Sequence, residues 1–418
     1  MTFTAARRSA SDEREPIADQ LRTLDELDVD GRRVLLRADF NVPLTASTVG
    51  TTVRVADDTR IRGGLPTIQE LRRRGARLVI VSDLGVPRGR DPALSMRPVA
   101  DRLGELVGAP VQFAAEVTGP QVRDLSERLE PCQILMLENI RFEPGEARGD
   151  PALAAALAEL ADVYVGDAFA AAHRSYASTS GVAHHLPSAA GHAMERELHA
   201  LGAIVDRPAR PLVAILGGTK IRDKLGMIRR FIELADTVCI GGAMCFPFLA
   251  ARGHSVGYSL CRKEDVEAAR AALATARGSV RRLELPTDLL VSRWGQDGSQ
   301  TRYLDGVEVP DGWMGLDIGA DSAARYAGLI AAAATVFWNG PMGRFELPQY
   351  TAATRTIADA VASASAMSVI AGAETVAALQ RFGLRDRVSH VSAGGTAMLE
   401  FLEGRPLPGV HVLLRRHG

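Results

Sequence analysis

The stretch Ala214-Ile215-Leu216-Gly217-Gly218-Thr219-Lys220-Ile221-Arg222-Asp223-Lys224 gives the strongest single indication of the fold. An apolar run ends in a Gly-Gly pair, and a polar segment with helical character follows. This order predicts a buried strand, a tight turn and the N-terminus of a helix. Backbone N–H groups at the start of a helix attract anions. The stretch therefore predicts an anion-binding turn between a strand and a helix.

Lys220 and Lys224 stand out because the chain has 49 basic residues and only three of them are lysines. An ammonium is a compact point charge and a guanidinium is a wide planar fork, so these two positions indicate a need for an ammonium. Their four-residue spacing predicts that both lie on one face of a helix. The alternative is an accident of composition on a solvated helix face.

Apolar runs rich in Val, Ile and Leu alternate with helix-like segments along the whole chain. The runs are residues 33–37, 77–81, 134–137, 162–165, 212–216, 237–240, 335–338, 368–370 and 389–391. Continuous apolar runs are typical of strands that are covered on both faces, as in parallel sheets. At 418 residues the chain exceeds the usual size of a single core. We therefore expect an α/β protein with two Rossmann-like domains, each with a mostly parallel sheet flanked by helices.

Composition excludes several classes of partner. The net charge of -1 argues against broad attraction to nucleic acid or to a membrane surface. No apolar run reaches the roughly 20 residues of a membrane span. Residues 1–20 are polar, carry charges of both signs and lack the apolar segment of a signal peptide, so we expect a flexible extension. The four cysteines show no CxxC spacing and are expected to be buried thiols of a cytoplasmic protein.

A glycine turn follows strand after strand in the second half of the chain. The turns are Gly217-Gly218, Gly241-Gly242, Gly372 and Gly394-Gly395. In an open parallel sheet they all lie at the carboxyl edge, where ligands bind, and the helix N-termini there suit a polyphosphate. No GxxxxGK[ST] loop is present, and no full GxGxxG follows a strand, so neither a Walker-type nor a dinucleotide site is indicated.

Two carboxylates accompany these turns. Glu346 lies in a turn-rich segment, residues 337–346, where it could accept a ribose hydroxyl. Glu374 stands at a helix start after Gly372 and could ligate magnesium, which prefers one or two carboxylates together with phosphate oxygens. The alternative for Glu374 is a glutamate that only interacts favourably with the helix dipole.

Polar side chains follow the strand ends of the first half as well. They are Asp39, Asn41, Arg141 and Arg174, with Arg60 after an Asp-Asp-Thr segment. Arginines that converge from separate strand ends recognise an anionic substrate with bidentate geometry, although each alone could be an ordinary surface residue. One half that binds a polyphosphate and another that binds a small anion indicate phosphoryl transfer after domain closure.

Long ordered motifs resemble the phosphoglycerate kinase family from about residue 21 to the C-terminus. They are Arg37-Ala-Asp-Phe-Asn-Val-Pro-Leu44, Asp57-Asp-Thr-Arg-Ile61, Leu137-Glu-Asn-Ile-Arg-Phe142, Asp167-Ala-Phe169, Ala172-His-Arg174, Ile215-Leu-Gly-Gly-Thr-Lys220 and Trp338-Asn-Gly-Pro-Met-Gly343. The resemblance implies reversible phosphoryl transfer between MgATP and the carboxylate of 3-phosphoglycerate, with an acyl phosphate as product. It also implies Mg²⁺ as cofactor, ATP or ADP as co-substrate, and a monomer.

The resemblance implies a division of the chain around a hinge. Residues 21–188 are the expected substrate-binding domain, residues 189–206 an interdomain helix, and residues 207–398 the nucleotide-binding domain. The last segment, residues 399–418, is expected to return to the N-terminal domain.

The resemblance also implies roles for individual residues. In the first half, Asp39 and Asn41 match contacts to the substrate hydroxyl and carboxylate. Arg60 is similar to the catalytic arginine that steadies the carboxylate and the moving phosphoryl group. Arg141 and Arg174 are similar to arginines that bind the substrate phosphate.

In the second half, Lys220 is similar to the catalytic lysine on the transferred phosphoryl group, and Lys224 to one on the nucleotide phosphates. Glu374 takes the place of the family's magnesium aspartate, and Gly394-Gly395 match its catalytic anion-binding turn. The other implied nucleotide contacts are Gly217, Gly218, Gly241, Gly242, Leu316, Asn339, Pro341, Glu346, Gly372 and Thr375.

One motif departs from the family pattern. Ser82-Asp83-Leu84-Gly85-Val86-Pro87 stands where the family has Ser-His-Leu-Gly-Arg-Pro, so two cationic contacts to the substrate's distal phosphate are replaced by Asp83 and Val86. Losing one charge-assisted contact costs about 1.5–3 kcal/mol. Three interpretations remain open: phosphoglycerate kinase activity that is reduced, a different carboxylate acceptor, or a silent member that binds nucleotide or a protein partner.

Overall fold

The computed structural model describes residues 15–46, 53–219, 221–277, 281–293, 295 and 300–415. It divides by its contacts into two compact units. The first unit consists of Met1–Gly202 with Pro406–Gly418, and the second of Ala203–Arg405. Each unit has its own buried core, built around Leu36 and Ile80 in the first and around Ile215 and Trp338 in the second. The expected α/β fold class is confirmed.

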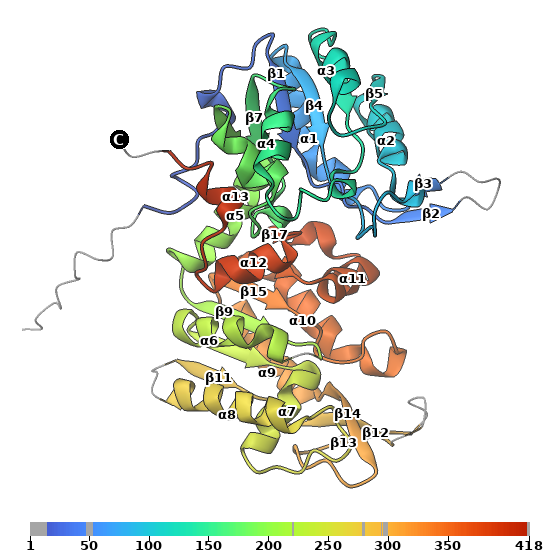
Figure 1. Cartoon of the computed structure of the whole chain (residues 1–418). Helices are drawn as coiled ribbons and strands as arrows, with labels where there is room; N and C mark the ends of the chain where they lie inside the picture. The colour runs from blue at the N-terminus through green and yellow to red at the C-terminus, as the bar shows by residue number, and fades with distance from the viewer. Residues whose placement is uncertain are drawn as a thin grey trace, which may run out of the picture. The chain divides into compact units, whose positions relative to one another are not determined.

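The first unit contains a six-stranded parallel sheet in the order β5-β6-β4-β1-β7-β8. Its strands are β1 (Arg33–Arg37), β4 (Arg77–Val81), β5 (Val111–Phe113), β6 (Ile134–Met136), β7 (Val163–Gly166) and β8 (Ser188–Ala190). Its helices are α1 (Thr59–Arg73), α2 (Arg97–Val107), α3 (Pro120–Glu127), α4 (Pro151–Ala158), α5 (His192–Val205), which reaches the boundary of the unit, and the short α13 (Pro408–His411) (Figure 1). Strands β2 (Leu44–Ala46) and β3 (Val53–Val55) form a separate antiparallel pair.

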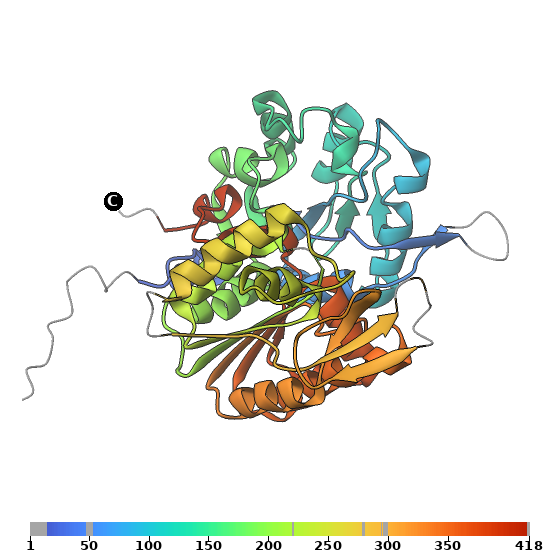
Figure 2. The ribbon, with the colours of Figure 1, turned by 90° about the horizontal axis from the view of Figure 1, so that it is seen from below.

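The second unit contains another six-stranded parallel sheet, in the order β11-β10-β9-β15-β16-β17. Its strands are β9 (Leu212–Leu216), β10 (Thr237–Ile240), β11 (Arg282–Glu284), β15 (Thr335–Asn339), β16 (Met367–Ala371) and β17 (His390–Val391). Its helices are α6 (Leu225–Leu234), α7 (Cys245–Ala251), α8 (Lys263–Arg277), α9 (Ala320–Ala331), α10 (Ala352–Ser363), α11 (Ala373–Phe382) and α12 (Gly395–Leu402). Helices α6 and α8 cover one face of this sheet, and α9 and α10 cover the other (Figure 2).

The order of strands in the second sheet reverses between β9 and β15. The helix that follows β9, α6, lies on one face of the sheet, and the helix that follows β15, α10, lies on the other. In open α/β sheets this switch point is where ligands bind. The Gly217-Gly218 turn follows β9, and the segment that starts at Gly340 follows β15. These two glycine-containing segments therefore lie at the switch point.

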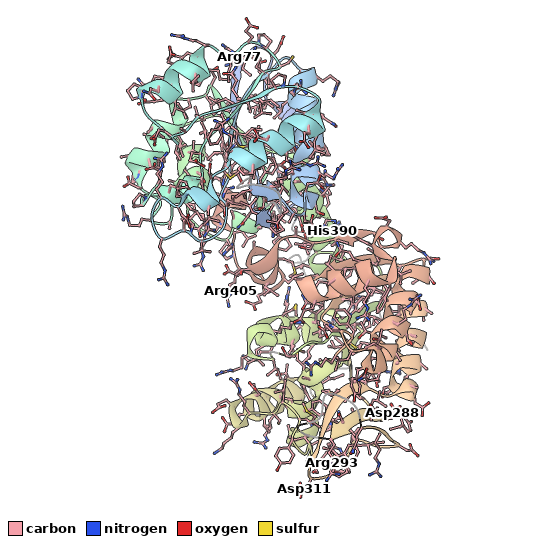
Figure 3. The ribbon with its side chains drawn as sticks, turned by 90° about the vertical axis from the view of Figure 1, so that its right-hand side faces the viewer. Arg77, Asp288, Arg293, Asp311, His390 and Arg405 are labelled. Atoms are coloured by element: carbon pink, nitrogen blue, oxygen red, sulfur yellow. The ribbon has the colours of Figure 1, made fainter. Side chains whose placement is uncertain are left out.

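A three-stranded antiparallel sheet, β13-β12-β14, is attached to the second unit. Its strands are β12 (Leu289–Arg293), β13 (Thr301–Leu304) and β14 (Trp313–Ile318). Asp288 and Arg293, labelled in Figure 3, lie directly before β12 and at its end. Strand β12 pairs in antiparallel register with both β13 and β14.

Helix α5 lies inside the segment expected as an interdomain helix, and residues 188–190 before it form β8 instead. The carboxylate of Asp167 accepts the N–H groups of Ala193 (2.8 Å) and Met194 (3.1 Å) in the first turn of α5. Burial raises the pKa of Asp167 to about 6, although these bonds oppose that shift. Asp167, which follows β7, thereby ties the start of α5 to the first sheet.

The C-terminal segment packs on the beginning of the described chain. The N–H of Arg22 donates to the carbonyl of Leu413 (2.9 Å), and Arg415 forms a salt bridge of 2.7 Å with Glu26. The change of unit falls at residue 406, after α12, whereas the sequence placed it at residue 399.

The expectation of four buried thiols is wrong for Cys132. Cys239 and Cys245 are buried, Cys261 is partly buried and Cys132 is exposed, and all four are free. Cys132 lies in the turn before β6, where its φ is 68°, and therefore outside the buried strand that begins at Ile134.

Candidate active site

The turns after β9, β10 and β15 interlock through their backbones. The N–H of Gly217 donates to the carbonyl of Asn339, and the N–H of Gly218 to that of Pro341, both at 2.9 Å. A Cβ atom on Gly217 would overlap the carbonyl oxygen of Pro341, and one on Gly242 would lie 2.6 Å from the nitrogen of Gly218. Glycine is required here because backbone packs on backbone, so Pro341 and the Gly241-Gly242 turn belong to the same cluster.

Lys224 points into this cluster. Its Nζ donates to the carbonyl of Gly217 (2.8 Å) and to that of Asn339 (3.2 Å). Residues 222–224 form a 3₁₀ turn, and the α-helix begins only at Leu225. The prediction that Lys224 lies on a helix face is therefore wrong: Lys224 is the N-cap residue of α6. Lys220 lies outside the described residues.

Glu374 and Thr375 reach the same cluster from the first turn of α11. Gly372, with a φ of 89°, is the N-cap residue of this helix. Thr375 is buried and its hydroxyl accepts the N–H of Gly340 at 2.7 Å, so it fixes the turn after β15. Glu374 is exposed, and a Cβ atom added to Gly218 would lie 3.6 Å from Glu374 Oε2 and 3.5 Å from Lys224 Nζ. An acidic and a basic group thus flank one glycine.

Glu374 fits a magnesium ion that is bound jointly by one carboxylate and by substrate phosphates. Within the described ranges, no three His, Cys, Asp or Glu side chains are grouped so that they could hold a metal ion. A single exposed carboxylate suits Mg²⁺, which keeps several waters and takes its other ligands from substrate phosphates. The structure therefore fits a metal that arrives with a nucleotide, and Glu374 is its candidate protein ligand.

The remaining predicted nucleotide residues lie in or beside the segment after β15, or in the turn after β17. Leu316 in β14 accepts the N–H of Arg344 at 2.8 Å. Glu346 is exposed, and its backbone carbonyl accepts from Arg381. Gly394 and Gly395 follow β17 at the start of α12, where Gly395 has a φ of 53° and open space around its Cα. Gly394 and Gly395 thus follow a strand of the second sheet, whereas Leu316 lies in the antiparallel sheet β13-β12-β14.

In the first unit, Asp39 and Arg60 form a close pair after β1 and at the start of α1. Arg60 Nη1 donates to Asp39 Oδ1 (2.7 Å) and Oδ2 (2.6 Å). The Arg60 side chain keeps 36% of its surface exposed. The carboxylate therefore orients the guanidinium and leaves part of it open to solvent.

Asn41, Asp83 and Arg141 form a second cluster at the same sheet edge. Asp83 is 6% exposed and accepts from Arg141 Nε at 2.9 Å and from Asn41 Nδ2 at 3.4 Å. Its other oxygen accepts from Arg37 Nη2 at 2.6 Å. Burial alone would raise the pKa of Asp83, but the charges of Arg37 and Arg141 hold it below its ordinary value.

Val86 and Arg174 are exposed, Val86 at 82%. The structure gives neither side chain a contact with the Asp83 cluster. The sequence interpretation overlooked Arg37, Glu146 and Ser178, which lie behind Asp83. A signal for Arg37 was present, because an arginine at the end of an otherwise apolar strand must find a buried acceptor.

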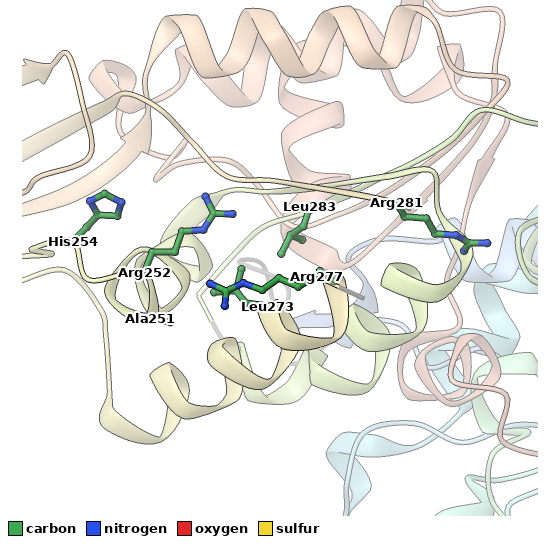
Figure 4. A pocket seen from close by; sticks show the side chains of 8 residues that line it. Ala251, Arg252, His254, Leu273, Arg277, Arg281 and Leu283 are labelled. Atoms are coloured by element: carbon green, nitrogen blue, oxygen red, sulfur yellow. The ribbon is translucent and has the colours of Figure 1, made fainter. Parts of the chain in front are cut away.

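A cavity of about 520 Å³ opens at the opposite edge of the second sheet. It is lined by the ends of α7 and α8 and by residues that precede or begin β11, with Arg252, His254 and Arg277 among them (Figure 4). Helices α7 and α8 end here, and carbonyl-rich helix C-termini favour cations such as Arg252 and Arg277. This cavity does not include any predicted site residue.

Comparison with known proteins identifies the family. The sequence profile described as "Phosphoglycerate kinase" matches residues 24–405. The chain is 48% identical to the phosphoglycerate kinase of Rubrobacter xylanophilus over 94% of this chain and 98% of that protein. It is 47% identical to that of Desulforudis audaxviator over 94% and 99%.

A solved structure gives the same result. The phosphoglycerate kinase of Coxiella burnetii superimposes with a TM-score of 0.85 at 36% identity, over 94% of this chain and 98% of that one. Agreement in sequence and in fold covers both units and both clusters of candidate residues. The chain belongs to the phosphoglycerate kinase family.

Proposed function

We propose that this chain catalyses reversible phosphoryl transfer between MgATP and the carboxylate of 3-phosphoglycerate. The observation that carries the proposal is the cluster at the switch point of the second sheet, where Lys224 and Glu374 flank Gly218. Glycine turns and a point cation suit the phosphates of a nucleotide, and a carboxylate suits the metal that accompanies them. In this proposal the second unit binds the nucleotide and the first unit binds the acid.

The reaction needs positioning and neutralisation of charge more than a nucleophilic side chain. A carboxylate oxygen of the acid forms a bond to the γ-phosphorus, and the bond from that phosphorus to the ADP oxygen breaks. Arg60, oriented by Asp39, steadies the attacking carboxylate. Lys220 and the Gly394-Gly395 turn contact the transferred group, and Lys224 contacts the nucleotide phosphates. Glu374 would hold the magnesium ion that accompanies the nucleotide, and that ion would supply further positive charge to the phosphate oxygens.

The acid is held by Asp39 and Asn41 at its hydroxyl and carboxylate end and by Arg141 and Arg174 at its phosphate. Support comes from the placement of Asp39, Asn41 and Arg141 at one sheet edge of the first unit. Adenosine contacts are assigned to Pro341 and Glu346, which lie in the segment after β15, and to Leu316, whose carbonyl accepts the N–H of Arg344 in that segment.

We also propose that the protein acts as a cytoplasmic monomer without nucleic acid or membrane partners. Four free cysteines suit a reducing compartment. None of the helices within the described residues combines the length and the apolar character needed to cross a bilayer. Side chains of this one chain supply both clusters, so the reaction needs no second copy.

A coupled assay tests the proposal. The full chain is supplied with MgATP and 3-phosphoglycerate, and formation of the acyl phosphate is followed through its reduction by glyceraldehyde-phosphate dehydrogenase and NADH. We expect turnover that needs both substrates and Mg²⁺ and that falls at least 100-fold in Arg60→Ala, since one preorganised charge contributes roughly 10²–10³. Absence of turnover in the wild-type chain would refute the proposal.

A further inference from the structure

Asp83 divides its two carboxylate oxygens between two arginines. Oδ1 accepts from Arg37 Nη2 at 2.6 Å, and Oδ2 accepts from Arg141 Nε at 2.9 Å. Asp83 follows β4 directly and is 6% exposed. The protein itself therefore supplies a carboxylate to the arginines at this edge of the sheet.

Arg37 fixes the position of this anion. Its side chain is 1% exposed, and its other hydrogen bonds go to Ser178 Oγ (3.0 Å) and to the carbonyl of Ala38 (2.6 Å). Glu146 lies behind Ser178, with 2.6 Å between Glu146 Oε1 and Ser178 Oγ, and its burial raises its pKa. The direct carboxylate partner of Arg37 is therefore Asp83, and a buried guanidinium requires such a partner.

Arg141 shares the same carboxylate but faces outward. Only its Nε donates to Asp83, and within the described residues no hydrogen bond is made by its Nη atoms. The side chain is 31% exposed. An incoming anion that binds these Nη atoms meets a guanidinium whose charge is already partly neutralised by Asp83. The nearby Val86 adds no cation.

We propose that Asp83 sets the acceptor selectivity of this chain. Because its negative charge offsets part of the positive charge of Arg37 and Arg141, it reduces the advantage of an acceptor with a distal phosphate dianion over the same hydroxy acid without that phosphate. The acceptor class is therefore 2-hydroxy carboxylates, with a phosphate group tolerated but weakly selected. This inference rests on the proposed function, because it assigns the distal group to Arg141.

Selectivity is measured as the ratio of kcat/KM for 3-phosphoglycerate to that for D-glycerate, with MgATP, through hydroxylamine trapping of the acyl phosphate. The informative variant is Arg37→Met with Asp83→Leu, because an apolar replacement of both members of a buried pair leaves neither member as an unpaired buried charge. It frees Arg141 from the carboxylate. Asp83→Asn keeps the shape and removes only the charge, and Asp28→Asn, at an exposed pair with Arg32, is the matched control.

We expect the ratio to rise at least tenfold in the double variant and in Asp83→Asn, through a lower KM for 3-phosphoglycerate with kcat nearly unchanged. A tenfold change corresponds to about 1.4 kcal/mol of differential binding. The control should leave the ratio unchanged. If Asp83→Asn does not fold, the double variant alone decides.

A ratio that stays constant or falls in the double variant would overturn the inference, because Asp83 would then only position Arg141. Failure of the proposed function is distinguishable, since in that case the wild-type chain would form no acyl phosphate from either acid.

Discussion

Lys224 Nζ lies 2.8 Å from the carbonyl oxygen of Gly217, so the ammonium is held at the end of β9 by the glycine turn itself. The carbonyl of Asn339, at the end of β15, provides a second acceptor at 3.2 Å. The carbonyls at two adjacent strand ends thus hold the ammonium of Lys224 beside Gly218. In a chain with only three lysines among 49 basic residues, this geometry explains the lysine at position 224, because a planar guanidinium cannot place a compact charge between two converging carbonyls.

Lys224→Arg should therefore impair the enzyme although it keeps the charge. We expect kcat/KM for MgATP to fall by roughly 10²-fold, equal to about 2.7 kcal/mol of transition-state stabilisation. Steady-state kinetics at saturating acid measures the effect. Lys263→Arg is the matched control, because Lys263 is an exposed residue at the start of α8 and its replacement should change nothing. Equal kinetics for both variants would refute this role of Lys224.

Gly217→Ala should destabilise the second unit strongly. The new Cβ would overlap backbone oxygens of Pro341 and Gly340, and backbone cannot move away as a flexible side chain can. We expect a loss of more than about 3 kcal/mol, the range of severe steric substitutions. Gly328→Ala in α9 should instead stabilise by about 0.5–1 kcal/mol, since nothing lies within 4 Å of its Cβ position. Urea unfolding, followed by circular dichroism, compares the two variants. Similar unfolding midpoints for both would show that the backbone packing around Gly217 does not contribute to stability.

Glu374→Gln should weaken the response to magnesium selectively. The change keeps the length of the side chain and removes the charge that a hard cation prefers. We expect the Mg²⁺ concentration for half-maximal activity to rise by roughly tenfold, with activity largely restored at saturating metal. A magnesium titration at fixed ATP measures this. An unchanged midpoint would show that Glu374 only interacts with the dipole of α11.

Asp317→Asn should change the pH dependence of stability. Asp317 is buried beside Gly343, and burial raises its pKa to about 8 in spite of hydrogen bonds from the N–H groups of Ala353 and Ile318. The unfolded chain loses this proton near the ordinary value of 3.8, so between about pH 4 and pH 8 the folded state binds more protons. Its contribution to the free energy of unfolding therefore decreases as pH rises through this range.

An asparagine does not titrate, so the stability of Asp317→Asn relative to the wild type should increase from pH 5 to pH 8, by at most about 1.4 kcal/mol per pH unit. Chemical denaturation at pH 5, 7 and 8.5 measures the difference. Parallel curves for the two proteins would mean that Asp317 is ionised throughout.

Much of the fold could be predicted from the sequence because the strands of both sheets are buried on two faces. The central residues of strands such as β1, β4 and β9 form apolar runs, and the Gly217-Gly218 turn marks the end of β9. The short strands β5 and β8 were not predicted, since three residues with mixed burial or small side chains carry no periodic signal.

The candidate site was predicted less completely. Residue type and position identified Asp39, Arg60, Lys224 and Glu374, which the structure places at strand ends or helix starts. The surroundings of Asp83 could not be predicted, because a motif shows which residue is replaced but not where its charge is neutralised. Sequence suggested a carboxylate that faces substrate phosphate, whereas the structure shows one buried against Arg37. Long-range pairing of this kind depends on the packing of separate strands.

In the proposed reaction, one phosphorus atom passes from the nucleotide to an acid oxygen. The most direct test incubates the full chain with Mg²⁺, 3-phosphoglycerate and ATP labelled with ³²P at the γ position, and then adds hydroxylamine. We expect label to move to an acyl phosphate of the acid and hydroxylamine to release it as phosphate, leaving the hydroxamate. Label that stays in ATP, or that appears as free phosphate without any hydroxamate, would contradict it.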